Sequence, residues 1–315
     1  MSQDSSQPQA KVVVLTTGGT ISCTQGPDGA LVPTIEGDAL LAGIRERFSD
    51  TTTIEVRDLF RLDSSSMTFS DIDEIVAAVQ ETLADPTITG IVVTHGTDSM
   101  EESAVAVDTF LDDPRPVVFT GAQKPFDAPD PDGPGNLFEA IVIAADASAR
   151  GIGALIVFGH AVIPARGAVK WHTSDELAFA TNGPEEPTRP DPVRPVRLAE
   201  TRVDIISGYP GADATQVRAA LSEGAQGLVV TGLGAGNVGT ELGKALGDTL
   251  DAGVPVVIST RVPRGEVVGN YGGAGGGATL LSKGALGSSY FRSGQARVLL
   301  AIAIATGRHP ATLIG

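Results

Sequence analysis

The feature that most constrains the fold is a series of short apolar runs that recur along the chain, with helix-like segments between them. Most of these runs lack polar alternation, as strands do when both faces of their sheet are covered. The runs are Val12–Thr16, Gly90–Thr94, Val117–Thr120, Ala154–Phe158, Leu228–Val230 and Val254–Ser259. Strands that alternate with helices predict a doubly wound, mostly parallel α/β sheet, which binds ligands at the carboxyl ends of its strands.

The segments between the runs carry helix signals. One begins with capping chemistry at Ser70 and continues with an apolar stripe at 3.6-residue spacing as far as Leu83. Two further helices are expected over 98–111 and 135–149. The order of strand and helix signals is therefore the one that a doubly wound fold requires.

A proline-rich stretch interrupts this alternation. Between Thr181 and Thr201, five prolines stand among acidic residues and three arginines. Such a composition does not fit a sheet interior and indicates an extended connector. We predict a flexible N-terminus over 1–10, a larger N-terminal catalytic domain over 11–182, a linker over 183–203 and a smaller C-terminal α/β domain over 204–315.

Composition argues against several classes of function. A formal net charge of −16 does not suit a nucleic-acid-binding surface, which needs clustered Lys and Arg. The single cysteine, Cys23, rules out an internal disulfide, and the four histidines lack ligand spacing, so no metal site is expected. No apolar stretch approaches the roughly 20 residues of a membrane span. Because Ser2–Ala10 is polar and has no secretory signal pattern, we expect a cytoplasmic protein, although removal of a leader is an open alternative.

Two of the apolar runs end in turns that carry glycine and small hydroxyl residues. Thr17–Thr20 follows the first run, and His95–Asp98 follows the second. Glycine lets a substrate carbonyl approach peptide N–H groups closely, so a threonine in such a turn is a candidate nucleophile. Each candidate also has a structural interpretation, because the Thr20 hydroxyl is typical of turns and Asp98 is typical of a helix N-cap.

A lysine further along the chain is a candidate base. Lys170 stands between Val169 and Trp171, which predicts a partly desolvated amine, and desolvation lowers the pKa of a lysine. The alternative is a surface lysine that extends its charge to solvent. The serines of Ser64–Ser66 form a polar turn, or they supply hydroxyl and backbone donors to a carboxylate.

Taken together, these residues resemble the bacterial-type L-asparaginases of the asparaginase/glutaminase family. The two signature motifs of that family are similar to Thr17-Gly18-Gly19-Thr20-Ile21-Ser22 and His95-Gly96-Thr97-Asp98-Ser99-Met100. Further matching segments are Asp63–Met67, Thr120–Gln123, Asp132–Leu137, Lys170, Gly232–Asn237 and Gln295–Leu300. The resemblance covers nearly the whole chain in the expected order.

The resemblance implies hydrolysis of L-asparagine to L-aspartate and ammonia through a threonine acyl-enzyme, with no metal or organic cofactor. It makes Thr20 the primary nucleophile, and it makes Thr97, Asp98 and Lys170 a second catalytic set in which Lys170 acts as base through Thr97. Backbone N–H groups near Gly19 and Thr97 would form the oxyanion hole. The family's usual assembly implies a homo-oligomer, either a dimer or a tetramer.

The resemblance also implies the contacts with substrate. Asp98 would bind the α-ammonium group, Ser64 and Ser65 the α-carboxylate, and the Ala122 carbonyl the side-chain amide. The substrate-binding residues expected on this basis are Gly19, Ser64, Ser65, Gly96, Thr97, Asp98 and Ala122.

The chain departs from the family pattern at the lid over the site. Family members carry a tyrosine shortly after the nucleophile, whereas residues 22–40 contain none. Tyr271, in a glycine-rich segment, or a water molecule is expected in its place. Three alternatives stay open: a glutaminase-asparaginase of broader range, since one methylene is worth only about 1–3 kcal/mol, a non-catalytic amino-acid-binding protein, and an amidotransferase subunit.

Overall fold

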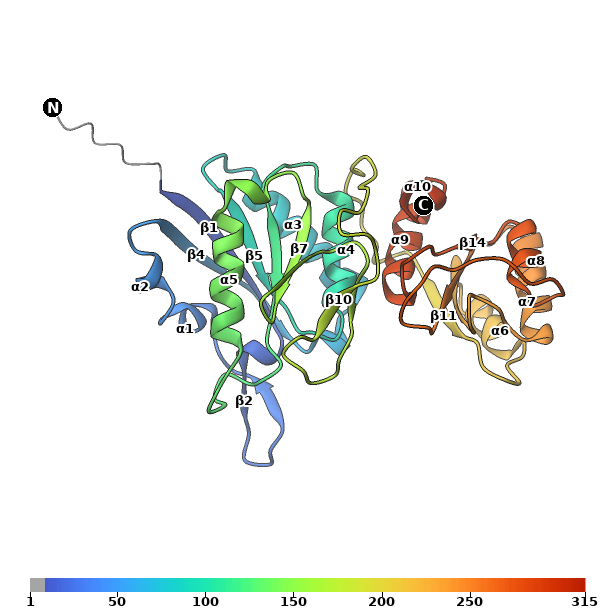
Figure 1. The fold of residues 1–315 in the computed structure, drawn as a ribbon, viewed down its shortest axis with the longest axis horizontal. Helices are drawn as coiled ribbons and strands as arrows, with labels where there is room; N and C mark the ends of the chain where they lie inside the picture. Colours follow the sequence, from blue (N-terminus) through green and yellow to red (C-terminus); the bar gives the residue numbers. More distant parts are fainter. Residues whose placement is uncertain (1–8, 315) are drawn as a thin grey trace. The chain divides into compact units, whose positions relative to one another are not determined.

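The protein is described by a computed structural model that covers residues 9–314. The chain divides into two compact units (Figure 1). The first contains the residues up to Ala165 together with Lys170–Ala180, and the second contains Arg166–Val169 and the residues from Thr181 onward. Each unit has a sheet and a hydrophobic core of its own.

The first unit is built on a six-stranded sheet in the order β4-β1-β5-β6-β7-β8. Its strands are β1 (Ala10–Gly18), β4 (Thr52–Leu62), β5 (Gly90–Thr94), β6 (Val117–Thr120), β7 (Ala154–Phe158) and β8 (Ala161–Pro164). Neighbouring strands pair in parallel, except that β7 and β8 are antiparallel. The predicted mostly parallel sheet is therefore confirmed.

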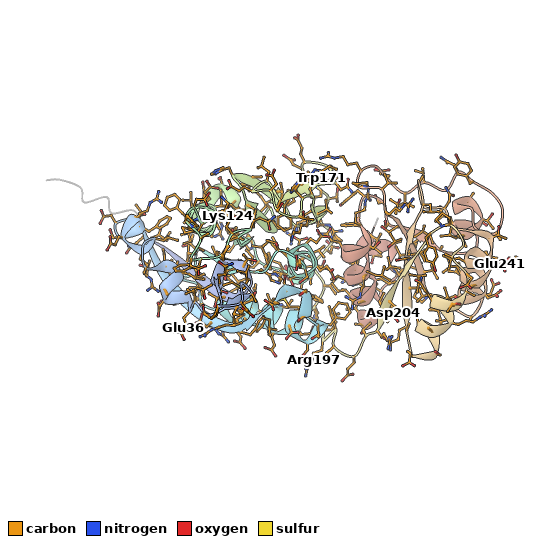
Figure 2. All side chains as sticks on the ribbon, turned by 90° about the horizontal axis from the view of Figure 1, so that it is seen from below. Glu36, Lys124, Trp171, Arg197, Asp204 and Glu241 are labelled. Carbon is orange, nitrogen blue, oxygen red and sulfur yellow. The ribbon has the colours of Figure 1, made fainter. Side chains whose placement is uncertain are left out.

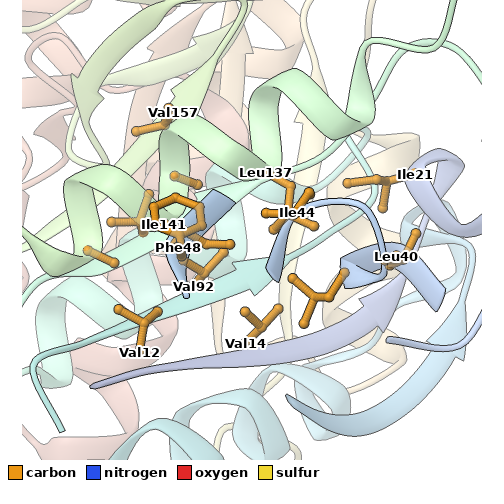
Figure 3. Packing of buried hydrophobic residues seen from close by; sticks show 14 of the residues in the cluster. Val12, Val14, Ile21, Leu40, Ile44, Phe48, Val92, Leu137, Ile141 and Val157 are labelled. Carbon is orange, nitrogen blue, oxygen red and sulfur yellow. The ribbon is translucent and has the colours of Figure 1, made fainter. Parts of the chain in front are cut away.

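Helices cover both faces of this sheet (Figure 1). They are α1 (Gly37–Leu41), α2 (Arg45–Phe48), α3 (Phe69–Leu83), α4 (Met100–Phe110) and α5 (Gly133–Ala145), with 3-10 turns η1 (Thr20–Ser22), η2 (Ser64–Ser66) and η3 (Ala147–Ala149). On the α5 side, Leu137 and Ile141 pack against Val12 and Val92 of the sheet (Figure 3). Because both faces of the sheet are buried, the sequences of its central strands are continuous apolar runs.

Two strands of the sheet, β4 and β8, were not predicted. In β4, charged residues such as Glu55 and Arg57 are exposed, while Ile54 and Val56 are partly buried against the core. This alternation is that of an edge strand with one open face, and it escapes a search for continuous apolar runs.

A short antiparallel hairpin follows η1 and extends away from the sheet (Figure 1). It consists of β2 (Cys23–Gln25) and β3 (Leu31–Pro33). The Thr24 and Thr34 hydroxyls are 2.8 Å apart across it, and the Phe126 N–H donates to the Cys23 carbonyl at 2.8 Å. These contacts hold the base of the hairpin in place.

The second unit has a four-stranded parallel sheet in the order β11-β12-β13-β14. Its strands are β11 (Val203–Ser207), β12 (Gly227–Gly232), β13 (Val256–Thr260) and β14 (Leu286–Gly287), and its helices are α6 (Thr215–Ser222), α7 (Thr240–Asp251), α8 (Gly277–Ser282), α9 (Ser293–Thr306) and α10 (Ala311–Ile314). Helix α9 packs along β11, β12 and β13. The predicted smaller α/β domain is confirmed as a fold.

Two connecting regions bear on the predicted domain limits. Residues 183–202 contain no helix or strand, but Val193 and Leu198 within them are buried, so the connector is partly packed. The predicted limits themselves, with a linker over 183–203, stay a prediction. The flexible N-terminus expected over 1–10 lies almost entirely outside the described residues.

The short strands β9 (Ala168–Lys170) and β10 (Phe179–Thr181) pair with each other. No helix in the described part of the chain is both long and apolar enough to cross a bilayer.

Candidate active site

The turns after β1 and β5 meet at one edge of the sheet. The two strands pair in register, with Thr16 opposite Thr94, so both turns begin at the same level. The Thr17 hydroxyl donates to the Thr94 carbonyl at 2.9 Å. Gly19 has φ +79°, and a Cβ there would overlap the backbone of Gly96. Only glycine permits this approach, which brings the turn that carries Thr20 against the one that carries Thr97.

Thr20 is the first residue of η1 and is partly exposed. The turn is closed by Ser22, whose N–H and hydroxyl both donate to the Gly19 carbonyl, at 3.0 and 2.9 Å. Within residues 9–314, no group forms a hydrogen bond with the Thr20 hydroxyl. The interpretation of the Thr20 hydroxyl as a turn-stabilising group therefore has no contact to support it, and the hydroxyl is available to a ligand.

Lys170 joins the second turn through two contacts. Its Nζ lies 2.8 Å from Thr97 Oγ1 and 2.8 Å from Asp98 Oδ1. Thr97 is buried, while the Lys170 and Asp98 side chains are 21% and 61% exposed. An amine at this distance can exchange a proton with the hydroxyl, and the carboxylate holds the amine in place. Because Ser99 stands at the N-cap of α4, Asp98 is free of a capping role.

Two residues that the sequence did not single out complete the surroundings of this pair. The Thr97 hydroxyl donates to Gln123 Oε1 at 3.4 Å, and Glu101 Oε2 accepts the Lys170 backbone N–H at 2.5 Å. Burial raises the pKa of Glu101 to about 7. Glu101 directly follows the motif residue Met100, and Gln123 is the last residue of the matching segment Thr120–Gln123, but neither position by itself indicates a contact with Thr97 or Lys170.

The aromatic neighbour of Lys170 contributes less shielding than the sequence suggested. Trp171, labelled in Figure 2, lies at the surface. Its side chain is 46% exposed, so almost half of it is left to solvent. The Lys170 amine contacts oxygen atoms of Thr97 and Asp98, whereas Glu101 accepts the Lys170 backbone N–H.

The two predicted serines have different surroundings. Ser64 is buried; its Oγ accepts the Asp98 N–H at 3.1 Å, and its carbonyl accepts the Ser99 hydroxyl at 2.7 Å. A Cβ on Gly96 would lie 2.5 Å from Ser64 Oγ, so glycine is needed for this contact. Ser65 is exposed. Ser64 thus braces the second turn, whereas Ser65 is open to solvent.

The turn after β6 reaches the same edge of the sheet. Thr94 of β5 pairs with Thr120 of β6, and Ala122 follows two residues later. Ala122 is buried, and the groups on both sides of it bond to Asp132 and Asn136.

His95 is the first residue of the second turn, and its side chain is buried. Its imidazole nitrogens contact the Gly96 carbonyl at 2.7 Å and the Ser103 hydroxyl at 2.8 Å. Complete burial lowers the pKa of His95 to about 4, so the ring is neutral. Over the described part of the chain, no group of three or more His, Cys, Asp or Glu residues is arranged to hold a metal ion.

Comparison with known proteins identifies the family to which the chain belongs. Residues 11–189 match the family described as Asparaginase, N-terminal, and residues 202–313 match the Glutaminase/Asparaginase C-terminal domain. The chain belongs to the asparaginase family. This asparaginase-family protein is therefore a hydrolase, as its sequence motifs suggested.

Individual relatives of this asparaginase-family protein are similar over nearly their whole length. An L-asparaginase of Bacillus licheniformis is 31% identical over 310 residues, which cover 94% of this chain and 96% of that protein. A probable L-asparaginase of Deinococcus radiodurans is 34% identical over 315 residues, which cover 94% of this chain and 94% of that protein. The crystal structure of a probable cytoplasmic L-asparaginase from Campylobacter jejuni aligns with a TM-score of 0.82 at 26% identity, covering 96% of this chain and 97% of that one.

Tyr271 is the expected replacement for the lid tyrosine. Tyr271 belongs to the second unit and is exposed. Its entry into a site therefore stays a prediction.

Proposed function

We propose that this protein hydrolyses L-asparagine to L-aspartate and ammonia, with Thr20 as the nucleophile and an aspartyl ester as the intermediate. The observation that carries the proposal is the contact of Lys170 Nζ with Thr97 Oγ1 at 2.8 Å, beside the backbone contact of Gly19 with Gly96. The Thr20 hydroxyl, which has no hydrogen-bond partner within residues 9–314, and the Thr97 hydroxyl, which is bonded to the Lys170 amine, therefore lie at the same edge of the sheet.

In the first half of the reaction, Thr20 Oγ attacks the side-chain amide carbon and a C–O bond forms. Backbone N–H groups near Gly19 and Thr97 stabilise the oxyanion. The proton of the Thr20 hydroxyl is transferred to the amide nitrogen, and ammonia departs as the C–N bond breaks. In the second half, water attacks the ester and loses a proton to Lys170 through Thr97. The C–O bond to Thr20 breaks, the Thr20 oxygen takes up the proton that water lost, and aspartate is released.

The substrate contacts follow from chemical complementarity. The Asp98 carboxylate, which is largely exposed, is suited to the α-ammonium group of the substrate. We assign the α-carboxylate to Ser65 and to the turn braced by Ser64, and the amide N–H to the Ala122 carbonyl. These assignments need no metal and no organic cofactor.

A broader substrate range is the second candidate. A glutaminase-asparaginase of Pseudomonas aeruginosa is 28% identical over 285 residues, which cover 83% of this chain and 78% of that protein. Glutamine is one methylene longer than asparagine, a difference worth about 1–3 kcal/mol in a fitted pocket. We propose asparagine as the preferred substrate and glutamine as the poorer one.

We further propose a homo-oligomeric enzyme, dimer or tetramer, in the cytoplasm. The assembly rests on the family resemblance, and light scattering on the purified protein tests it. The location is supported by the cytoplasmic relative from Campylobacter jejuni, whereas a Haemophilus influenzae relative is named as periplasmic. Cell fractionation distinguishes the two.

The test of the activity is ammonia release by the purified protein from L-asparagine and from L-glutamine. Thr20→Ala and Thr97→Ala should each remove release from asparagine, because each lacks a reacting hydroxyl. Thr53→Ala, the same change at an exposed position of β4, is the matched control and should keep wild-type rates. A wild-type protein that binds asparagine in calorimetry without releasing ammonia is a binding protein and not an asparaginase.

A further inference from the structure

The N-cap and first turn of α5 form hydrogen bonds with the backbone on both sides of Ala122. The Asp132 carboxylate accepts the N–H groups of Gln123 and Lys124, each at 2.9 Å. Asn136 Nδ2 donates to the Gly121 carbonyl at 3.0 Å. Two side chains one helical turn apart thus bind the backbone immediately before and immediately after Ala122.

Asn136 is itself held from the other side. It is buried, and its Oδ1 accepts the N–H of Gly159, the residue after β7, at 3.0 Å. Its Nδ2 also lies 3.4 Å from Asp132 Oδ2. A buried amide that uses both ends fixes the rotamer and gives the turn after β6 a rigid support.

The same helical turn touches the chain beside the nucleophile. Gly133 begins α5, and a Cβ built on it would lie 2.8 Å from Ile21 Cγ1 and 3.3 Å from the Cβ of Ala122. Ile21 directly follows Thr20 and is buried. The first turn of α5 therefore packs against both the Thr20 turn and Ala122, and it sets the spacing between them.

These contacts leave the Ala122 carbonyl as an unused acceptor in the turn after β6. The Gly121 carbonyl and the N–H groups of Gln123 and Lys124 are occupied, and no group within residues 9–314 donates to the carbonyl of Ala122. We propose that Asp132 and Asn136 are positioning residues that hold this carbonyl as the acceptor for the substrate's side-chain amide N–H. This inference rests on the proposed asparagine hydrolysis, and it attributes the enzyme's preference for amide substrates to the Ala122 carbonyl.

Loss of these positioning contacts should affect amide substrates more than ester substrates. An amide offers an N–H to the Ala122 carbonyl, whereas an ester of the same carboxyl group offers none. Loosening the turn after β6 therefore removes a hydrogen bond from asparagine and nothing equivalent from L-aspartate β-methyl ester. A purely structural role for Asp132 and Asn136 would instead slow both substrates together.

The experiment measures kcat and KM for L-asparagine and for L-aspartate β-methyl ester. In Asn136→Ala, kcat/KM for asparagine should fall about tenfold or more, and that for the ester less than about threefold, since one hydrogen bond is worth roughly a factor of ten. Glu139→Gln is the control on the same helix: its carboxylate contacts His160 at 2.6 Å, and the amide-to-ester ratio should not change.

Asp132→Asn carries the same test if Asn136→Ala does not fold, because it retains one acceptor oxygen. Parallel losses on both substrates in either folded variant, with an active wild type, overturn this inference alone. A wild-type protein that cleaves neither substrate overturns the proposed function and this inference with it.

Discussion

At the scale of single residues, substitutions of Lys170 test whether its amine acts as a base or only supplies a positive charge. Lys170→Met keeps the length of the side chain and removes Nζ, so kcat should fall by about 10²–10⁴, the range for loss of a general base. Folding should be little changed, because the Asp98 carboxylate left behind is exposed.

Lys170→Arg completes this prediction. Arginine stays protonated at any working pH and cannot accept a proton, so the variant should be as slow as Lys170→Met. Ammonia release with a thermal melt of each variant checks both. Wild-type turnover by Lys170→Arg would mean that charge alone is required.

His95 should make the folded protein sensitive to acid. Its pKa is about 4 when folded, against an ordinary value of 6.5. Between these values the unfolded chain binds a proton that the folded chain does not, so stability falls as the pH drops from 6.5 to 4. The loss is on the order of 3 kcal/mol.

Urea unfolding of the wild type and His95→Gln at pH 4, 5, 6 and 7 measures this term. The variant cannot titrate at this position, so its stability should change less over the interval. Equal pH slopes would show that His95 is not the group responsible.

Sequence reasoning reached the residues that stand in recognisable turns and missed those defined by contact. Thr20 and Thr97 were singled out because glycine-rich turns follow apolar runs and match a family. Glu101 meets the Lys170 backbone across 69 positions of the chain, and Gln123 meets Thr97 across 26. Such pairings exist only after the strands have been ordered in the sheet.

At the scale of elements, the glycine of the second turn should be irreplaceable. In Gly96→Ala the new Cβ would lie 2.5 Å from Ser64 Oγ and displace the bracing of Asp98. We expect kcat/KM for asparagine to fall at least about tenfold, as for loss of a positioning contact. Gly43→Ala is the control, since a Cβ there meets nothing within 4 Å. Unchanged kinetics in Gly96→Ala would contradict this part of the site.

Arg115 should matter for folding alone. It is buried and donates to the carbonyl of Leu83, the last residue of α3, and to those of Asp85 and Ile88 just after the helix. It also pairs with Asp113 at 2.7 Å. Arg115→Met leaves buried acceptors unsatisfied and should cost about 2–4 kcal/mol.

Urea unfolding checks this cost, and kcat of the folded fraction should be unchanged. A variant as stable as the wild type would show that the carbonyls find other partners.

Elements buried on both faces were predictable, and those at edges were not. The runs that became β5, β6 and β7 were located to the residue, because burial on both sides leaves no polar positions within them. Helix α3 begins at Phe69, and its N-cap is Thr68, two residues before the predicted cap at Ser70. The Asp71 carboxylate accepts from the Thr68 N–H and hydroxyl. Polar caps mark a helix start only to within a residue or two.

At the scale of the whole molecule, local patterns predicted two α/β units but not the order of their strands. The order β4-β1-β5 depends on crossovers, which no apolar run encodes. All the residues assigned here to chemistry belong to the first unit. The second unit contributes its own sheet, and the resemblance over 202–313 identifies it as part of the same family fold.

The most direct measurement is to trap the intermediate. The protein is mixed with excess L-asparagine, quenched in acid within the steady state and digested, and the peptides are weighed by mass spectrometry. The proposed mechanism predicts an aspartyl ester on the peptide that contains Thr20, absent from Thr20→Ala. An ester on the peptide that contains Thr97, or steady ammonia release with no ester on either peptide, would contradict it.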